Sequence, residues 1–250
     1  MGEKQAPGST AQRAAPEELR RRLALALDVD DLVVAHRLAK ELRPWFGVAK
    51  VGLELYSATG PDVVVEFANA GYRVFLDLKF HDIPTTVGRA ARVMGALGAS
   101  FLTLHAHGGV SMLRAGVEGL AEGAEGAGLE PPTALAVTIL TSDGDAPSHV
   151  LGNRVRAAVE SGCGGIVCAA SDVREAKQLA PRLLAVVPGI RLPGASPDDQ
   201  ARASTPQAAF AAGADLLVVG RAVTAARDPV TAAATLVEGL TEEGDEAGSD

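Results

Sequence analysis

Three charged residues, Asp77, Lys79 and Asp82, lie at close spacing at the end of an apolar run. Side chains alternate between the two faces of a β-strand, so Asp77 and Lys79 would share one face of a strand ending here. Charged side chains are rarely buried without a partner. A carboxylate beside an ammonium group at the end of a strand therefore suggests a functional site, and the third charge, Asp82, strengthens this interpretation. A structural ion pair at a strand end is the simpler alternative.

Short apolar runs alternate with helical patterns along the rest of the chain. We expect strands at residues 23–27, 47–51, 73–78, 101–105, 134–137, 165–169, 183–187 and 216–219. We expect helices between them at 31–43, 86–97, 111–120, 150–161, 172–180 and 205–212. Continuous apolar strands separated by helices are typical of a parallel sheet covered by helices. Eight such units in roughly 220 residues predict an α/β fold of the (β/α)8 barrel type. An open, doubly wound sheet is less favoured, because the turn after the first strand has no glycine-rich fingerprint.

The composition agrees with a compact soluble enzyme, and no internal repeat or Pro/Gly-rich linker divides the chain, so we expect one domain. Of the 250 residues, 47% are hydrophobic and 22% are charged, and the net charge of −8 argues against a nucleic-acid-binding surface. No apolar stretch is long enough to cross a membrane, and the first residues do not resemble a secretory signal, so we expect a cytoplasmic protein. We expect the catalytic domain at 18–240, a disordered extension at 1–17 and an acidic disordered tail at 241–250.

Polar residues recur where the predicted strands end, which is where the active site of a (β/α)8 barrel forms. They are Asp28, Lys50, Asp77, Lys79, His105, Thr141, Arg191 and Arg221, the last preceded by Gly220. This convergence favours an enzyme or a small-ligand site over a purely structural barrel.

The ends of the last two strands predict a phosphate site. Loops after strands seven and eight commonly bind phosphate in this fold. Gly220 would let the backbone approach an anion, and Arg221 would supply a guanidinium suited to phosphate. Arg191 and Gln200 flank a loop that could fold over the bound group. As an alternative, Arg221 would only pair with a nearby carboxylate.

The block Asp77-x-Lys79-x-x-Asp82-Ile83-Pro84 resembles the signature of the orotidine 5′-phosphate decarboxylase family, and further matches run from about Asp28 to Arg221. The resemblance implies a cofactor-independent enzyme, without a metal, that converts orotidine 5′-phosphate (OMP) to UMP and carbon dioxide in pyrimidine biosynthesis. It implies that Lys79 is the proton donor in a charge network with Asp77, Asp82 and Lys50.

The same resemblance implies the substrate contacts. Asp28 and Lys50 would contact the ribose, and Thr141 would contact the pyrimidine, with Thr138 as the register alternative. Gln200, Gly220 and Arg221 would contact the phosphate, and Arg191 lies at the start of the closing loop. Ile83 and Thr86 are further substrate-binding residues. Members of the family are homodimers in which the counterparts of Asp82 and Thr86 reach into the neighbouring subunit's site, and the same is implied here.

Two other functions remain open at this point. A metal-dependent phosphosugar enzyme, either a 3-keto-sugar-phosphate decarboxylase or an epimerase, would use similar loops, with His105 and His107 as metal ligands. The chain departs from the pattern of the orotidine 5′-phosphate decarboxylase family at two places: His107 stands where a small residue is more usual, and the segment 141–162 is shorter than usual. A non-catalytic sensor of phosphate ligands would not need Lys79 between two carboxylates.

Overall fold

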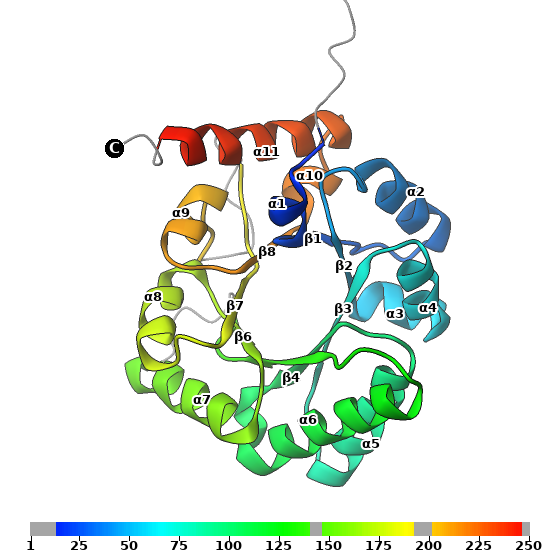
Figure 1. Cartoon of the computed structure of the whole chain (residues 1–250), viewed down its shortest axis with the longest axis vertical. Coiled ribbons are helices and arrows are strands. Elements are labelled where there is room, and N and C mark those ends of the chain that lie inside the picture. The colour runs from blue at the N-terminus through cyan, green and yellow to red at the C-terminus, as the bar shows by residue number, and fades with distance from the viewer. Residues whose placement is uncertain (1–13, 141–146, 193–201, 247–250) are drawn as a thin grey trace, which may run out of the picture.

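The protein folds as a closed barrel of eight parallel strands surrounded by helices (Figure 1). The computed structural model describes residues 14–140, 147–192 and 202–246. The strands pair in sequence order: β1 (Leu23–Ala26), β2 (Val48–Gly52), β3 (Arg73–Phe80), β4 (Phe101–His105), β5 (Thr133–Val137), β6 (Gly165–Val167), β7 (Leu184–Val187) and β8 (Leu216–Val219). The predicted (β/α)8 barrel is therefore confirmed.

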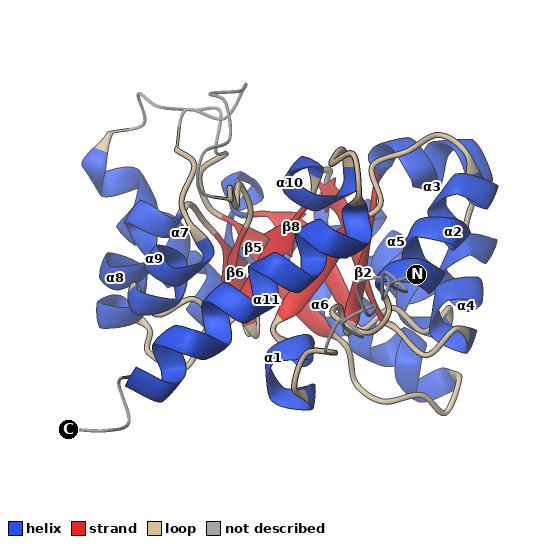
Figure 2. Ribbon diagram, turned by 90° about the horizontal axis from the view of Figure 1, so that it is seen from above, coloured by secondary structure: helices blue, strands red, loops and turns tan. Residues whose placement is uncertain are grey.

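The helices enclose the strands from outside (Figure 2). They are α1 (Glu17–Arg21), α2 (Leu32–Leu42), α3 (Leu53–Thr59), α4 (Asp62–Asn69), α5 (Pro84–Ala96), α6 (Gly109–Gly126), α7 (Ser148–Ser161), α8 (Ala170–Leu179), α9 (Pro206–Ala211), α10 (Arg221–Thr224) and α11 (Pro229–Glu246), with a 3-10 turn, η1 (Ala106–Gly108). The six predicted helices are present, whereas α1, α3, α4, α10 and α11 were not predicted. Within the described ranges, no helix is both long and apolar enough to cross a membrane.

Both predicted domain boundaries move outward. Ala15 lies inside the predicted N-terminal extension, yet it is buried in the core and its N–H donates to the Pro44 carbonyl at 3.1 Å. At the other end, α11 continues to Glu246, beyond the predicted end of the domain at residue 240. Buried Ala233, Leu236 and Val237 hold this helix against the barrel.

All eight strands fill the interior of the barrel. The interior cluster comprises Ala24, Ala26, Val48, Phe75, Phe101, Leu135, Val137, Val167, Val186, Leu216 and Val218. The two large rings, Phe75 and Phe101, meet edge to face with centroids 5.9 Å apart. The interior is therefore a packed core, and its upper layer forms a floor on which a site can be built.

Strand β3 is irregular near its carboxyl end. Leu76 pairs with Leu102 and Phe80 pairs with Leu104, so three residues of β3, 77–79, lie opposite the single residue Thr103 of β4. Lys79 lies in this bulge with φ of 49°, in the left-handed region that non-glycine residues seldom adopt. Bulges often redirect a side chain beside an active site. The strand predicted to end at residue 78 therefore extends to Phe80, with Lys79 in a conformation that simple alternation does not describe.

Helices α5 and α6 pack with their backbones in direct contact. A Cβ atom on Gly119 would lie 2.1 Å from the Gly88 carbonyl oxygen, and one on Gly123 would lie 1.9 Å from the Arg92 carbonyl oxygen. Only glycine fits at these positions. Since α5 begins at Pro84, this packing also fixes the direction in which the chain leaves Asp82.

We predict that Gly123→Ala destabilises the protein by about 3 kcal/mol, the upper end of typical overpacking, because the new methyl group must displace backbone of α5. Gly126→Ala is the matched control, since a Cβ there meets nothing within 4 Å and lies in the same helix. It should be neutral or stabilising by up to about 1 kcal/mol. Denaturant unfolding of both variants measures the difference. Equal stability of the two variants would contradict the close backbone contact.

Candidate active site

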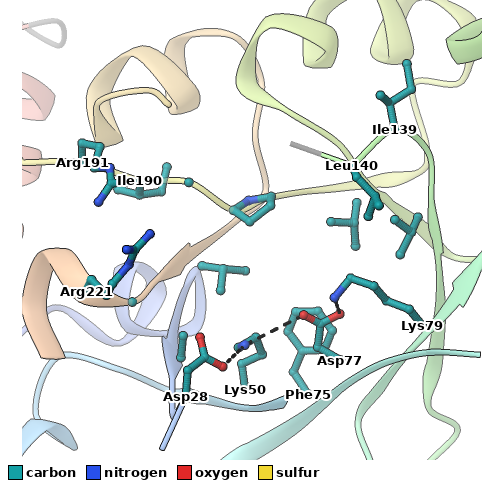
Figure 3. A pocket seen from close by; sticks show the side chains of 17 residues that line it. Asp28, Lys50, Phe75, Asp77, Lys79, Ile139, Leu140, Ile190, Arg191 and Arg221 are labelled. Carbon is teal, nitrogen blue, oxygen red and sulfur yellow. Dashed lines mark hydrogen bonds and ion pairs between the residues drawn. The ribbon is translucent and has the colours of Figure 1, made fainter. Parts of the chain in front are cut away.

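A cavity of about 320 Å³ lies at the carboxyl ends of the strands (Figure 3). This volume is within the range of small-ligand sites, roughly 300–1,000 Å³. Seven strand ends contribute to its lining: Ala26, Asp28, Lys50, Phe75, Asp77, Lys79, Val137, Ile139, Leu140, Val167, Pro188, Gly189, Ile190, Arg191, Val218, Gly220 and Arg221. The sequence predicted seven of these residues: Asp28, Lys50, Asp77, Lys79, Arg191, Gly220 and Arg221.

Lys50 lies between two carboxylates on one side of the cavity. Its ammonium nitrogen is 2.5 Å from Asp28 Oδ1 and 3.9 Å from Asp77 Oδ2. The lysine side chain is only 8% exposed, and the two carboxylates compensate the cost of placing its charge away from water.

Lys79 extends the same line of charges. Its Nζ lies 2.8 Å from Asp77 Oδ1, and both side chains are partly buried. Asp28, Lys50, Asp77 and Lys79 therefore form a row of alternating sign from β1 to β3, and Figure 3 shows the lysine at its end facing the cavity. The predicted contact between Asp77 and Lys79 is present.

Two neighbours of this row were not predicted. Thr103, in the middle of β4, is fully buried, and its hydroxyl oxygen accepts a hydrogen bond from the Lys79 backbone N–H at 2.8 Å. Gly52 follows Lys50 on β2, where a Cβ atom would lie 2.9 Å from Asp28 Oδ1 and 3.1 Å from Lys50 Nζ. Glycine thus leaves room for that ion pair. A threonine within a strand and a glycine at a strand end are common features, so neither is a sequence signal by itself.

Two arginines line the end of the cavity away from Lys79. Arg191 and Arg221 follow β7 and β8, and Figure 3 shows both on the opposite side from the lysine. The Arg191 N–H donates to the Ser204 carbonyl at 2.9 Å, and the Ser204 N–H donates to the Gly189 carbonyl at 3.2 Å. These bonds fix the chain beside Arg191. Gly220 also lines this end, and a Cβ there would make ordinary contact with Ala26 at 3.4 Å.

Asp82, Ile83 and Thr86 lie outside this cavity. All three are exposed, and Asp82 Oδ1 accepts a hydrogen bond from the Ile83 N–H at 2.6 Å. No ion pair joins Asp82 to Lys79 within the described part of this one chain. Within the single chain, Lys50, Asp77 and Lys79 form the charge network, and the predicted part of Asp82, which was expected to reach a neighbouring subunit's site, stays a prediction.

The predicted pyrimidine and phosphate contacts Thr141 and Gln200 lie outside the described residues. The register alternative, Thr138, is fully buried and donates its hydroxyl to the Val167 carbonyl at 2.9 Å. Thr138 does not line the cavity, and its hydroxyl proton is used in a hydrogen bond within the barrel wall.

The histidines proposed as metal ligands lie beside the site. The ring centroids of His105 and His107 are 6.3 Å apart and nearly perpendicular, with His81 stacked on His105. Burial is the main cause that lowers the pKa of His105, and the nearby Arg154 guanidinium lowers it further, so the neutral ring is favoured. The Nδ1 atom of His105 accepts a hydrogen bond from the His107 backbone N–H. Among the residues that the structure describes, no group of three or more His, Cys, Asp or Glu side chains is arranged to hold a metal ion.

Comparison with known proteins decides the family. The family described as "Orotidine 5'-phosphate decarboxylase / HUMPS family" matches residues 21–236. The chain belongs to this family. Orotidine 5'-phosphate decarboxylase of Anaeromyxobacter dehalogenans is 44% identical over 230 residues, covering 88% of this chain and 98% of that protein. The enzyme of the same name from Thermobifida fusca is 43% identical over 235 residues, covering 89% and 97%.

A solved structure agrees with these relatives. The crystal structure of orotidine 5'-phosphate decarboxylase from Lactobacillus acidophilus superposes with a TM-score of 0.74 at 33% identity, covering 87% of this chain and 98% of that one. The resemblance seen in the sequence is therefore confirmed. The expected enzyme class is also confirmed at the level of the family, since these relatives bear the name of a carboxy-lyase.

Proposed function

We propose that this protein is a cofactor-independent orotidine 5′-phosphate decarboxylase that forms UMP and carbon dioxide in pyrimidine biosynthesis in the cytoplasm. The observation that carries the proposal is the row Asp28–Lys50–Asp77–Lys79 along a cavity whose other end holds two arginines. OMP has the matching order of groups: a phosphate, a ribose with hydroxyls, and a pyrimidine with the scissile carboxylate. Relatives that bear this name over nearly their full length support the same reading.

The chemical step follows from the charges. The bond between C6 and the carboxylate carbon breaks, the electron pair stays on C6, and neutral carbon dioxide leaves. The Lys79 ammonium group, next to C6, stabilises the developing negative charge and then gives its proton to C6. The neutral amine regains a proton from solvent. UMP, carbon dioxide and the restored lysine balance the reaction.

Asp77 and Lys50 would hold that lysine in place. Asp77 Oδ1, at 2.8 Å from Lys79 Nζ, keeps the ammonium group oriented, and Lys50 balances the second oxygen of Asp77. The substrate carboxylate would lie close to Asp77, where like charges disfavour the bound ground state. Asp28 and Lys50 would contact the ribose hydroxyls, and Thr141 the pyrimidine.

No metal, flavin or nicotinamide enters this mechanism, because the Lys79 cation supplies both the electrostatic stabilisation and the proton. The test is a spectrophotometric assay with OMP, with and without exhaustive chelation. We expect equal turnover under both conditions and near-complete loss in Lys79→Ala. Lys177→Ala is the matched control: it also removes a partly buried lysine paired with an aspartate, at 2.6 Å from Asp215, but on α8 outside the cavity.

Two results would overturn the proposal. Loss of activity on chelation, restored by magnesium or zinc, would favour the metal-dependent phosphosugar reaction. A folded Lys79→Ala protein with turnover within about tenfold of the wild type would limit the contribution of Lys79 to about 1.4 kcal/mol, too little for the proton donor.

We assign the phosphate to the arginine end of the cavity, with Gly220 and Gln200 as further contacts. Arg221→Ala should raise the KM for OMP by about 10- to 100-fold, because a charge-assisted hydrogen bond contributes roughly 1.5–3 kcal/mol. Orotidine, which lacks the phosphate, should react equally slowly with the variant and the wild type. The surface variant Arg89→Ala serves as the control. If Arg221→Ala penalises orotidine as strongly as OMP, the residue has a structural role instead.

The exposed Asp82, Ile83 and Thr86 support a homodimer with shared sites. These residues are exposed and do not line the cavity of their own chain, and Ile83 is 65% exposed. In a two-fold symmetric dimer, each chain would contribute this segment to the site of its partner.

Mixing two inactive variants tests that arrangement. Asp82→Asn and Lys79→Ala chains, allowed to exchange subunits, form heterodimers with one site that has both residues intact. For a statistical mixture we expect about a quarter of wild-type activity, because about half of the dimers are mixed and each has one good site of two. If activity does not rise above that of the separate variants, Asp82 does not act across the interface.

A further inference from the structure

Thr103 lies opposite the bulge in β3. The pairs on either side of it, Leu76 with Leu102 and Phe80 with Leu104, leave this one β4 residue facing the extra length of β3. Its side chain is fully buried, whereas the β4 residues around it are apolar apart from His105. A polar side chain at such a position requires hydrogen-bond partners.

The Thr103 hydroxyl joins both members of the Lys79–Asp77 pair. Its oxygen accepts from the Lys79 backbone N–H at 2.8 Å, and its proton has two acceptors within reach, Asp77 Oδ1 at 3.2 Å and the Leu76 carbonyl at 3.4 Å. Asp77 Oδ1 is also the oxygen that accepts from Lys79 Nζ at 2.8 Å. One hydroxyl thus contacts the backbone of the lysine and the carboxylate that orients its ammonium group.

The hydrogen bond from the Lys79 backbone N–H to Thr103 helps to hold Lys79 in an unfavourable backbone conformation. Lys79 has φ of 49°, and a non-glycine residue in this region persists only where its surroundings hold it. Inside the bulge, the regular ladder to β4 is interrupted, and the Lys79 N–H bonds to the threonine side chain in place of a β4 carbonyl. A valine of nearly the same shape would remove the partner of this N–H and one donor to Asp77, in a place where both groups are partly shielded from water.

We propose that Thr103 is a positioning residue for the reaction: it holds Lys79 in the left-handed conformation and aims Asp77 at the lysine ammonium group. This inference rests on the proposed function, since it assumes that Lys79 and Asp77 act on the substrate. Thr103 itself does not line the cavity, so its effect passes through these two residues. Its loss should reduce turnover rather than binding, because the arginine end of the cavity is untouched.

The test compares Thr103→Val with Thr103→Ser in steady-state assays with OMP. The valine retains the shape and loses the hydroxyl, and the serine retains the hydroxyl. We expect Thr103→Val to lower kcat by about 10- to 100-fold with KM changed less than about threefold, since small misplacements of reacting groups reach effects of this size. Thr103→Ser should keep kcat within about threefold of the wild type.

Ser161→Ala controls for the loss of a buried hydroxyl. Ser161 is buried in the last turn of α7, where its hydroxyl bonds to carbonyls of its own helix. This variant should lose stability without a change in kcat. Thermal unfolding of all three variants separates folded fraction from turnover per folded molecule.

A crystal structure of Thr103→Val adds a geometric readout. We expect Lys79 to leave the left-handed region or its Nζ to move away from Asp77. A valine variant with kcat within threefold of the wild type, or one in which kcat falls only as the folded fraction falls, would overturn the inference.

The proposed function fails separately. A wild-type protein without OMP decarboxylation overturns both claims. An active wild type, an inactive Lys79→Ala and an active Thr103→Val would overturn only the role of Thr103.

Discussion

The geometry of the site depends on a mismatch in length between two neighbouring strands. In a closed barrel, β3 is paired on both sides, with β2 and with β4, so it cannot slide to absorb extra residues. The excess has to leave the strand locally as a bulge, and Lys79 lies at that point. The backbone distortion turns Lys79 toward the mouth while Phe80 resumes pairing with β4. With regular pairing to β4, residues 77–79 would have kept extended backbone conformations, and Lys79 would not have adopted its left-handed φ.

The row of charges is stable because signs alternate along it. Lys50 is almost completely removed from water, which carries a large desolvation penalty unless carboxylates lie close. Asp28 and Asp77 supply them from the strands on either side. The apolar floor of the barrel, including Phe75, Val137 and Val167, excludes water below the row. In such surroundings, fixed charges act more strongly on a bound substrate than they would in bulk water.

The sequence was sufficient for the fold and for the residues at strand ends. Asp28, Lys50, Asp77 and Lys79 were predictable because a parallel barrel collects the carboxyl ends of its strands at one mouth. Thr103 was not, since threonine is a common strand residue and its role depends on a register shift that periodicity does not reveal. Gly52 escaped notice for a similar reason: the need for glycine there comes from side chains of β1 and β2 that meet only in the folded state. Asp82 was expected from the family resemblance to reach the site of a neighbouring subunit, and in the single chain it is exposed, with its Oδ1 accepting from the Ile83 N–H.

The contact between α5 and α6 constrains how this protein can change over evolutionary time. Cores usually tolerate substitution by exchanging volume, so that a larger residue on one element is matched by a smaller one on its neighbour. At Gly95, Gly119 and Gly123 the opposing atoms all belong to the backbone, so no smaller side chain can compensate a gain in size. Sequence drift in these two helices is therefore confined to their outer sides, where exposed residues such as Arg89, Glu118 and Glu122 lie. The surface chemistry of this helix pair can diverge freely while its spacing stays fixed.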